Sequence, residues 1–401
     1  MLSSFKSDHL DQPRSAYLHI PFCRRRCYYC DFPISVLGQT NIETSQVIKE
    51  YVEVLCQEIL ATPSLGYPLE TIFFGGGTPS LLPIQSLDLI LYTLDQQFGI
   101  VKGAEISMEI DPGTFTLQQL QGYQQAGINR VSVGVQAFQD ELLKLCGRSH
   151  SVSDIFTAID LIKQANVPNF SLDLISGLPN QTIENWDDSL SQAIQISPNH
   201  LSCYDLVLEP VTAFGKRYSG GEKPLPTDET TAQMYCLAQS KLTSAGYEHY
   251  EISNYALNGY QCRHNRVYWE NWAYYGFGMG AASYTHRQRF TRPRNRKDYF
   301  PWVEHLIENN GKIDYPQSSK TDILLETLML GLRLKEGICL SRIKDQFGET
   351  VKDQILETLQ KYYTLEWVDY SGSNFKLTDP EGFLFSNTIL AALFECLDDS
   401  V

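Results

Sequence analysis

The sequence predicts an α/β protein, with a partial (βα)6 barrel followed by a smaller, mainly helical, winged-helix-like C-terminal domain. Short β-rich runs alternate with longer helical patterns over the first half of the chain, which is typical of βαβ units around a parallel sheet. The alternation ends near Pro226, and the chain after Tyr315 is mostly helical. We therefore expect three parts, at residues 1–225, 226–315 and 316–401.

Each element of the predicted barrel follows from this alternation. The six expected strands are Ala16–Ile20, Thr71–Phe74, Glu105–Ile110, Arg130–Val135, Phe170–Ile175 and Leu201–Leu206. The helices expected between them are Thr44–Leu60, Ile84–Phe98, Leu117–Ala126, Val152–Ala165 and Ile183–Ile196. Sites in such folds lie at the carboxyl ends of the strands, so polar residues that follow a strand are the candidates for function.

Composition excludes several classes of protein. The 401 residues carry a net charge of -15, which speaks against wholesale binding to nucleic acid or to anionic membranes. No apolar run approaches the length that spans a bilayer, and the N-terminus has no apolar signal core. We expect a cytoplasmic protein whose ten cysteines are reduced and free to bind metal.

Three cysteines follow the first predicted strand, in the stretch AYLHIPFCRRRCYYCDFPI. Cys23, Cys27 and Cys30 would supply thiolates, which favour iron-sulfur clusters, zinc or copper(I). Three thiolates on one loop can occupy three corners of a cuboidal cluster and leave the fourth iron without a protein ligand. A three-thiolate zinc site and three unrelated buried thiols are the alternatives.

A glycine triplet follows the second predicted strand, at Gly75, Gly76 and Gly77, with Thr78 after it. Glycines allow backbone groups to approach a ligand closely. A triplet alone is as consistent with a tight turn between strand and helix.

The CxxxCxxC spacing, with Tyr29 before the third cysteine, resembles the signature loop of radical S-adenosylmethionine (SAM) enzymes. Nearly the whole chain resembles one subgroup, the oxygen-independent coproporphyrinogen III oxidases and their haem-chaperone (HemW-type) relatives. The resemblance implies a [4Fe-4S] cluster on the three cysteines and SAM on the open iron, where a reduced cluster could cleave SAM to a 5'-deoxyadenosyl radical. The SAM contacts that it implies are Tyr17, Phe32, Gly75, Gly76, Gly77, Thr78, Glu109, Gln136, Arg148 and Asp173.

Two features favour the haem-chaperone branch of this subgroup. The oxidases have a further cysteine two places after the third, where this chain has Phe32, which cannot ligate iron. The stretch CRHNRVYW resembles the HNxxYW motif of the chaperones, and it implies a haem site whose residues are His264, Asn265, Tyr268 and Trp269. Imidazole is a natural axial ligand of haem iron, and Cys262 is a rival thiolate ligand.

The resemblance therefore predicts a haem chaperone on a radical SAM scaffold, with [4Fe-4S], SAM and haem as cofactors. Its partners would be haem-dependent acceptor proteins such as respiratory enzymes, through which it could contact a membrane peripherally. The alternative is an enzyme of porphyrin metabolism, coproporphyrinogen dehydrogenase, which decarboxylates coproporphyrinogen III oxidatively to protoporphyrinogen IX.

A basic run lies downstream of the motif, with six arginines and lysines between Arg287 and Lys297. Such a run is most often a solvated loop. The other hypothesis is that Arg292, Arg294 and Arg296 meet haem propionates or an acidic acceptor.

Overall fold

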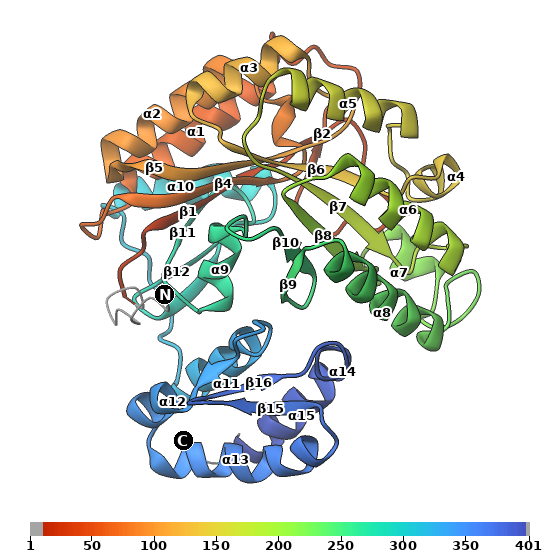
Figure 1. Cartoon of the computed structure of the whole chain (residues 1–401). Coiled ribbons are helices and arrows are strands. Elements are labelled where there is room, and N and C mark those ends of the chain that lie inside the picture. Colours follow the sequence, from red (N-terminus) through yellow and green to blue (C-terminus); the bar gives the residue numbers. More distant parts are fainter. Residues whose placement is uncertain (1–10, 398–401) are drawn as a thin grey trace.

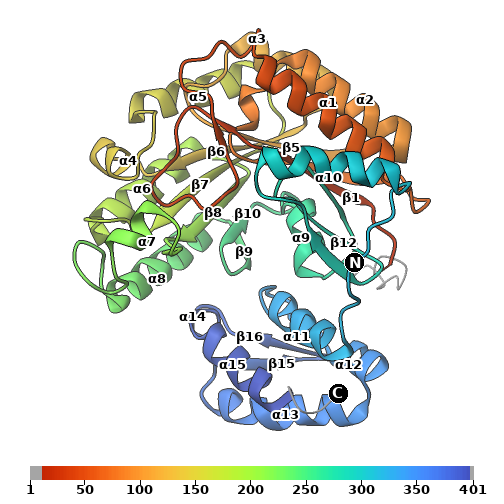
Figure 2. The same cartoon turned by 180° about the vertical axis from the view of Figure 1, so that it is seen from behind.

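The structure is a computed structural model that describes residues 11–397. Its centre is a nine-stranded sheet with the order β11-β1-β4-β5-β6-β7-β8-β10-β9. The seven strands from β11 to β8 are parallel to their neighbours, and β10 and β9 add an antiparallel edge. The sheet curves around an interior that is open on one side, and helices cover its outer face (Figures 1 and 2). This is the predicted fold class.

All six predicted strands are present, and most are longer than the sequence indicated. They are β1 Ser15–Ile20, β4 Leu69–Gly76, β5 Ile100–Ile110, β6 Arg130–Gln136, β7 Phe170–Ser176 and β8 His200–Asp205. Three further strands of the sheet come from the segment after residue 226, namely β9 Glu248–Glu251, β10 Asn254–Ala256 and β11 Tyr275–Phe277. Sequence patterns missed these three because each has only three or four residues.

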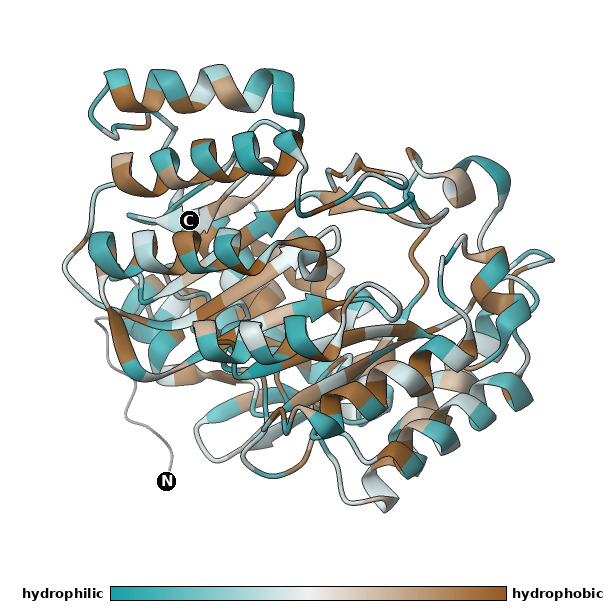
Figure 3. Cartoon of the chain, turned by 90° about the horizontal axis from the view of Figure 1, so that it is seen from above, coloured by the Kyte–Doolittle hydropathy of each residue, from teal (hydrophilic) through white to brown (hydrophobic). Residues whose placement is uncertain are grey.

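The outer helices form a row in which consecutive helices contact one another, from α10 through α1, α2 and α3 to α5, with α6 against α8 at the other end. Their bounds are α1 Gln46–Ala61, α2 Ile84–Phe98, α3 Leu117–Ala126, α4 Asp140–Leu145, α5 Val152–Gln164, α6 Ile183–Ile196, α7 Ala213–Arg217, α8 Asp228–Ser244, α9 Arg263–Trp269 and α10 Arg296–Glu308. Figure 3 shows that the strands are largely hydrophobic and that the helices alternate between hydrophobic and hydrophilic turns. The apolar residues of the sheet and the inner helix faces form one continuous core.

Local sequence explains why the helices begin where they do. Thr116, Ser151 and Thr182 are the N-cap residues of α3, α5 and α6, and each forms a capping box with the residue three positions on. The reciprocal bonds satisfy two backbone donors that a helix N-terminus otherwise leaves unpaired. Each of these caps lies beyond a loop that follows the preceding strand, and α4 lies between β6 and the cap of α5.

Several short elements lie between the larger ones. They are β2 Phe22–Cys23, β3 Ser35–Val36, the 3-10 helix η2 Pro79–Leu81, β12 Ala282–Thr285 and β13 Gln288–Thr291. β2 pairs with β3 in parallel, and β12 and β13 form an antiparallel hairpin. The β2–β3 pair brings together the two ends of the cysteine loop.

The C-terminal segment has a hydrophobic core of its own. Its elements are α11 Lys320–Gly331, β14 Ile338–Cys339, α12 Leu340–Phe347, α13 Glu349–Thr364, β15 Val368–Ser371, β16 Asn374–Leu377, α14 Glu381–Leu384 and α15 Ser386–Leu397. Its three strands form a small sheet in the order β14-β16-β15, packed among helices below the barrel (Figure 1).

Of the helices in residues 11–397, none is long and apolar enough to cross a membrane. The N-terminal stretch in which a signal core was sought lies mostly outside the described residues.

Candidate functional site

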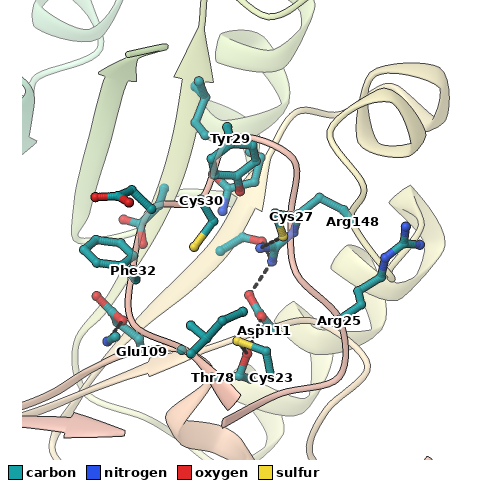
Figure 4. A pocket seen from close by; sticks show the side chains of 18 of the residues that line it. Cys23, Arg25, Cys27, Tyr29, Cys30, Phe32, Thr78, Glu109, Asp111 and Arg148 are labelled. Carbon is teal, nitrogen blue, oxygen red and sulfur yellow. Dashed lines mark hydrogen bonds and ion pairs between the residues drawn. The ribbon is translucent and has the colours of Figure 1, made fainter. Parts of the chain in front are cut away.

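A cavity of about 610 Å³ opens at the carboxyl ends of the parallel strands. It collects side chains from the cysteine loop and from the ends of five strands (Figure 4). Of the residues predicted to form the site, those that line the cavity are Cys23, Cys27, Cys30, Phe32, Gly76, Gly77, Thr78, Glu109, Gln136, Arg148 and Asp173. Residues far apart in sequence therefore meet in one place, as the strand-end argument predicted.

The cysteine loop is held from several sides. The amide of Tyr28 donates to the carbonyl of Cys146 at 3.0 Å, and the carbonyl of Tyr28 accepts from the amide of Phe214 at 2.9 Å. The guanidinium of Arg26 donates to the carbonyls of Cys30 and Phe32. These bonds fix the loop's path before any ligand binds, so the three thiols are positioned by backbone contacts.

The three thiols lie around the same cavity. Thr78 donates to the sulfur of Cys23 at 3.6 Å, and Arg148 donates to the sulfur of Cys27 at 3.7 Å. No three His, Cys, Asp or Glu side chains within the described part of the chain converge closely enough to hold a single metal ion. Thiols are the side chains that bind iron-sulfur clusters, and these three share one cavity.

Burial raises the pKa of the Cys23 thiol to about 12, and it also raises the pKa of Cys30. Metal ligation requires thiolates, so loading iron at this loop must release protons. The cations Arg26 and Arg148 act against the rise at Cys30, and Arg148 also donates to the sulfur of Cys27.

The glycine triplet has a structural role that the sequence alone did not indicate. Gly76 has φ 113°, and a Cβ there would lie 2.4 Å from the ring of His19. A Cβ on Gly77 would lie 2.7 Å from the carbonyl oxygen of Phe22, and the amides of Gly77 and Thr78 donate to the carbonyls of Ile20 and Phe22. Glycine is therefore required for the end of β4 to lie directly against the strand that enters the cysteine loop.

Glu109, on β5, faces the cavity beside this triplet. Its carboxylate accepts a hydrogen bond from the amide of Gly76 at 2.9 Å. Burial, with the nearby carboxylates of Asp173 and Asp111, raises the pKa of Glu109 to about 8 against the lowering effect of the Gly76 bond. Such a carboxyl is poised to receive a cationic group from a ligand.

Arg148 forms an ion pair with Asp111 inside the cavity, and it also donates to the carbonyl of Gly134 at 3.0 Å. Asp111 in addition accepts from the hydroxyl of Thr78 at 2.9 Å. Asp111 was missed by sequence reasoning, although it stands two residues after Glu109 in MEIDPGT. The signal that could have found it is its place directly after the end of a predicted strand.

The far wall of the cavity is formed by β6, β7 and β8. The Ser132 hydroxyl donates to the Asp173 carboxylate and lies 3.0 and 2.9 Å from its two oxygens, and burial raises the pKa of Asp173. Gln136 ends β6 in the left-handed region, with φ 69°, at an irregularity in the pairing with β7. That conformation turns the Gln136 side chain into the cavity instead of along the strand.

Two of the predicted SAM contacts, Tyr17 and Gly75, are not among the residues that line the cavity. The Tyr17 hydroxyl bonds to Nδ1 of His19 at 3.1 Å, and its ring stacks on Phe73. A Cβ on Gly75 would lie 3.0 Å from Tyr17 and 3.2 Å from the Glu109 carboxylate. Both residues lie immediately behind the cavity wall, where they support Glu109.

The HNxxYW motif forms α9, which lies at the opposite end of the strands from the cysteines. The His264 imidazole is fully buried, with Nδ1 bonded to Thr71 Oγ1 at 2.8 Å and Nε2 bonded to the Tyr268 hydroxyl at 2.9 Å. Glu105 accepts from the His264 amide at 3.0 Å. Burial lowers the pKa of His264 to about 3, so the ring is neutral and both of its nitrogens are occupied.

The other motif residues extend from the barrel toward the C-terminal segment. Trp269 lies under the guanidinium of Arg333, 4.5 Å from the ring centroid. Asn265 is half-buried on the same short helix. The structure therefore places this motif between the barrel and the C-terminal segment, away from the cysteine cavity.

Several arginines of the basic run have acidic partners. The pairs are Arg287 with Asp11, Arg289 with Glu326, Arg292 with Glu58 and Arg294 with Asp31. The Arg292–Glu58 pair is buried, and Glu58 also accepts from the hydroxyl of Tyr299 at 2.5 Å. Arg292 is thus a core residue, while Arg294 lies at the rim of the cysteine cavity.

Comparison with known proteins gives consistent results. A family model described as the Radical SAM superfamily matches residues 17–193, and one described as the HemN C-terminal domain matches residues 318–385. The heme chaperone HemW of Synechocystis sp. is 49% identical over 403 residues, which cover 96% of this chain and 98% of that protein. The heme chaperone HemW of Escherichia coli is 33% identical, with 94% and 97% covered.

Among solved structures, the coproporphyrinogen III oxidase HemN from Escherichia coli superposes with a TM-score of 0.80. It is 23% identical, and the match covers 98% of this chain and 91% of that one. This likeness extends to the C-terminal segment and shows a shared fold.

Proposed function

We propose that this chain, which belongs to the heme chaperone HemW family of the radical SAM superfamily, binds haem and delivers it to haem-dependent acceptor proteins. The observation that carries the proposal is the 49% identity to a heme chaperone across nearly the full length of both chains. Acceptors such as respiratory enzymes, and action in the cytoplasm, belong to the same proposal.

Membership of the superfamily implies a [4Fe-4S] cluster and SAM, and the cavity fits both. Of the described residues, Cys23, Cys27 and Cys30 are the only cysteines or histidines that line it. A cuboidal cluster held by three thiolates leaves one iron open to a ligand from solution. When bound, the cluster and SAM supply one-electron chemistry, and the protein supplies orientation and shielding.

The chain's own residues would orient SAM by its charged and polar groups. Glu109 would accept the methionine ammonium, and Arg148 would exchange its ion pair with Asp111 for the methionine carboxylate. Asp173 would accept hydrogen bonds from ribose hydroxyls. Gly76 and Gly77 line the same cavity, and their role is to let the end of β4 lie against the strand that enters the cysteine loop.

The HNxxYW residues stay a prediction as haem contacts. His264 could ligate an iron only by giving up its bond to Thr71 or its bond to Tyr268, which are themselves buried or half-buried in the same cluster. Breaking such a bond without replacement costs about 1–3 kcal/mol for the group left unsatisfied. Haem binding at His264 would therefore require α9 to rearrange.

The second candidate function is oxidative decarboxylation of coproporphyrinogen III, and the observation in its favour is the fold shared with HemN. Phe32 speaks against it: the side chain is 58% exposed at the cavity rim and cannot ligate iron.

One experiment separates the two functions. The protein is reconstituted anaerobically with iron and sulfide, and the same preparation is assayed for haem binding and for turnover of coproporphyrinogen III with SAM and a reductant. A chaperone binds haem stoichiometrically and gives no protoporphyrinogen. Turnover to protoporphyrinogen IX would overturn the proposal.

A further inference from the structure

The chain has eight histidines, and seven of them lie in the described residues. Five of the seven are buried and have both ring nitrogens within hydrogen-bonding distance of a protein partner. These five are His19, His150, His200, His249 and His264. None of the five can offer a nitrogen to an iron without losing a bond inside the fold.

The remaining two, His286 and His305, are exposed and line one cavity together. His286 is at the turn between β12 and β13, and His305 is in the last turn of α10. The chain between α10 and α11 completes the wall as it descends past β12 toward the C-terminal helices (Figure 2). This cavity shares no lining residue with the cysteine cavity.

The size and the wall of this cavity suit a flat, amphiphilic ligand. Its volume is about 760 Å³, within the range of about 300–1,000 Å³ that small-molecule and cofactor sites occupy. Trp302 and Tyr315 supply aromatic surface, and the buried ring of Phe290 packs behind Tyr315 at 5.3 Å. Lys312 lines the same cavity and offers a cation to a carboxylate.

The two imidazoles are chemically available. His305 is 72% exposed, and its Nε2 contacts the side-chain amide of Asn309 at 2.8 Å, a surface hydrogen bond that water can replace. His286 has φ 52° and the next residue, Arg287, has φ 56°, a pair of left-handed conformations that hairpin turns usually give to asparagine or glycine. The turn keeps His286 at the tip of the hairpin.

We propose that this second cavity binds haem, and that His286 or His305 supplies the axial ligand to its iron. The proposal rests on the haem-binding function proposed above and gives that function a site. Aromatic side chains would cover the porphyrin plane, and Lys312 would meet a propionate. Ligation here leaves the buried hydrogen bonds of α9 intact, which is what distinguishes this site from one at His264.

The test is a haem titration of the full-length protein with three variants. They are the double variant His286→Ala/His305→Ala, the variant His264→Gln, and Lys312→Ala. The measurements are the haem absorption spectrum, the electron paramagnetic resonance spectrum of the ferric form, and the rate of haem loss to a high-affinity scavenger. Circular dichroism and thermal unfolding monitor folding, and the two exposed histidines can be removed without disturbing the core.

We expect the double variant to lose the spectral signature of a nitrogen axial ligand and to release haem at least tenfold faster than the unaltered protein. We expect His264→Gln, where it stays folded, to keep that signature, and Lys312→Ala to release haem faster with an unchanged spectrum. If the double variant binds haem with the same spectrum and rate as the unaltered protein, this site is wrong while the chaperone function stands. If the unaltered protein binds no haem, the function and the site both fail.

Discussion

The carboxylate of Glu109 accepts a hydrogen bond of 2.9 Å from the amide of Gly76, which joins the ends of β5 and β4 at the cavity wall. The bond favours the ionised carboxylate, but burial outweighs it and raises the pKa of Glu109 to about 8. Below that pH the group is mostly protonated in the free protein. A cationic ligand group would then have to displace a proton.

This relationship predicts how SAM affinity depends on pH. As the pH rises from 6 to 7.5, the dissociation constant for SAM should fall by up to about tenfold per pH unit. The reason is that binding at Glu109 is coupled to the release of one proton. Isothermal titration calorimetry in buffers of different ionisation enthalpy would count that proton. Glu109→Gln should bind SAM more weakly and lose this pH dependence.

The raised pKa of Glu109 also predicts how the stability of the protein depends on pH. Measuring that dependence checks the pKa independently of SAM binding. The folded-state pKa of about 8 lies above the unfolded value of 4.5, so the folded protein holds a proton that the unfolded chain has lost between these pH values. The contribution of Glu109 to the free energy of unfolding is therefore fully present below pH 4.5. It is lost as the pH rises through 8, by at most about 1.4 kcal/mol per pH unit. Urea unfolding of Glu109→Gln against the unaltered protein should show this difference in slope; parallel curves would contradict the assignment.

The cysteine loop predicts an all-or-none loss of iron. Replacing Cys23, Cys27 or Cys30 with Ala should reduce the iron content of reconstituted protein from about four atoms per chain to near zero, because a cuboidal cluster cannot be held by two thiolates. Chemical iron and sulfide analysis measures this directly.

Cys146 provides the matched control for this series. It is buried next to the loop, and its carbonyl holds the amide of Tyr28, but its side chain does not line the cavity. Cys146→Ala should therefore keep the full iron content. A cluster that survives in Cys30→Ala and is lost in Cys146→Ala would show that the third ligand is misassigned.

The strands and helices of the barrel could be predicted because they are long and regular. The strands that were missed are short. Alternating runs and capping residues such as Thr116 and Ser151 mark the helices and strands locally. The edge strand Tyr275–Phe277 has three residues, and its position beside β1 depends on contacts across more than 250 residues of sequence. No local pattern contains that information.

The site, too, could be predicted only in part. Topology predicted a site at the carboxyl ends of the strands, and the family resemblance supplied its individual residues, most of which line one cavity. The partnership of Arg148 with Asp111 could not be foreseen, because it joins the loop between α4 and α5 to the residue after the end of β5. The surroundings of His264 were equally hidden, since Thr71 lies 193 residues away.

The Arg148–Asp111 pair should be strongly coupled in stability. The side chain of Arg148 is 9% exposed and that of Asp111 is 24% exposed, so Arg148→Ala leaves a mostly buried carboxylate without its partner. We expect a loss of about 3 kcal/mol, near the lower end of values for breaking a buried pair. Arg148→Ala/Asp111→Ala should recover part of that loss, and a double-mutant cycle by urea unfolding measures the coupling. Simple additivity of the two single variants would show that the pair contributes nothing to the fold.

His264 should act as a structural histidine in the absence of haem. His264→Gln should lower the free energy of unfolding at pH 7 by about 1–3 kcal/mol, because Thr71 or Tyr268 loses a partner. The folded-state pKa of about 3 lies below the unfolded value of 6.5, so the contribution of the neutral ring is full above pH 6.5 and is lost as the pH falls toward 3. The difference between the variant and the unaltered protein should therefore shrink on acidification, and a constant difference from pH 7 to 4 would contradict this role.

The basic run should divide into structural and surface arginines. Arg292 and Glu58 are 1% and 0% exposed, and Arg292→Ala would leave a buried carboxylate that only Tyr299 and a backbone amide still contact, at a cost of about 3–5 kcal/mol. Arg294 is 57% exposed in its pair with Asp31, and exposed pairs contribute about 0–1 kcal/mol. Arg294→Ala should therefore unfold at nearly the same urea concentration as the unaltered protein.

Haem retention then tests the propionate hypothesis with Arg294→Ala alone, since any loss of haem in Arg292→Ala would follow from unfolding. Unchanged haem retention in Arg294→Ala would exclude Arg294 from the haem site.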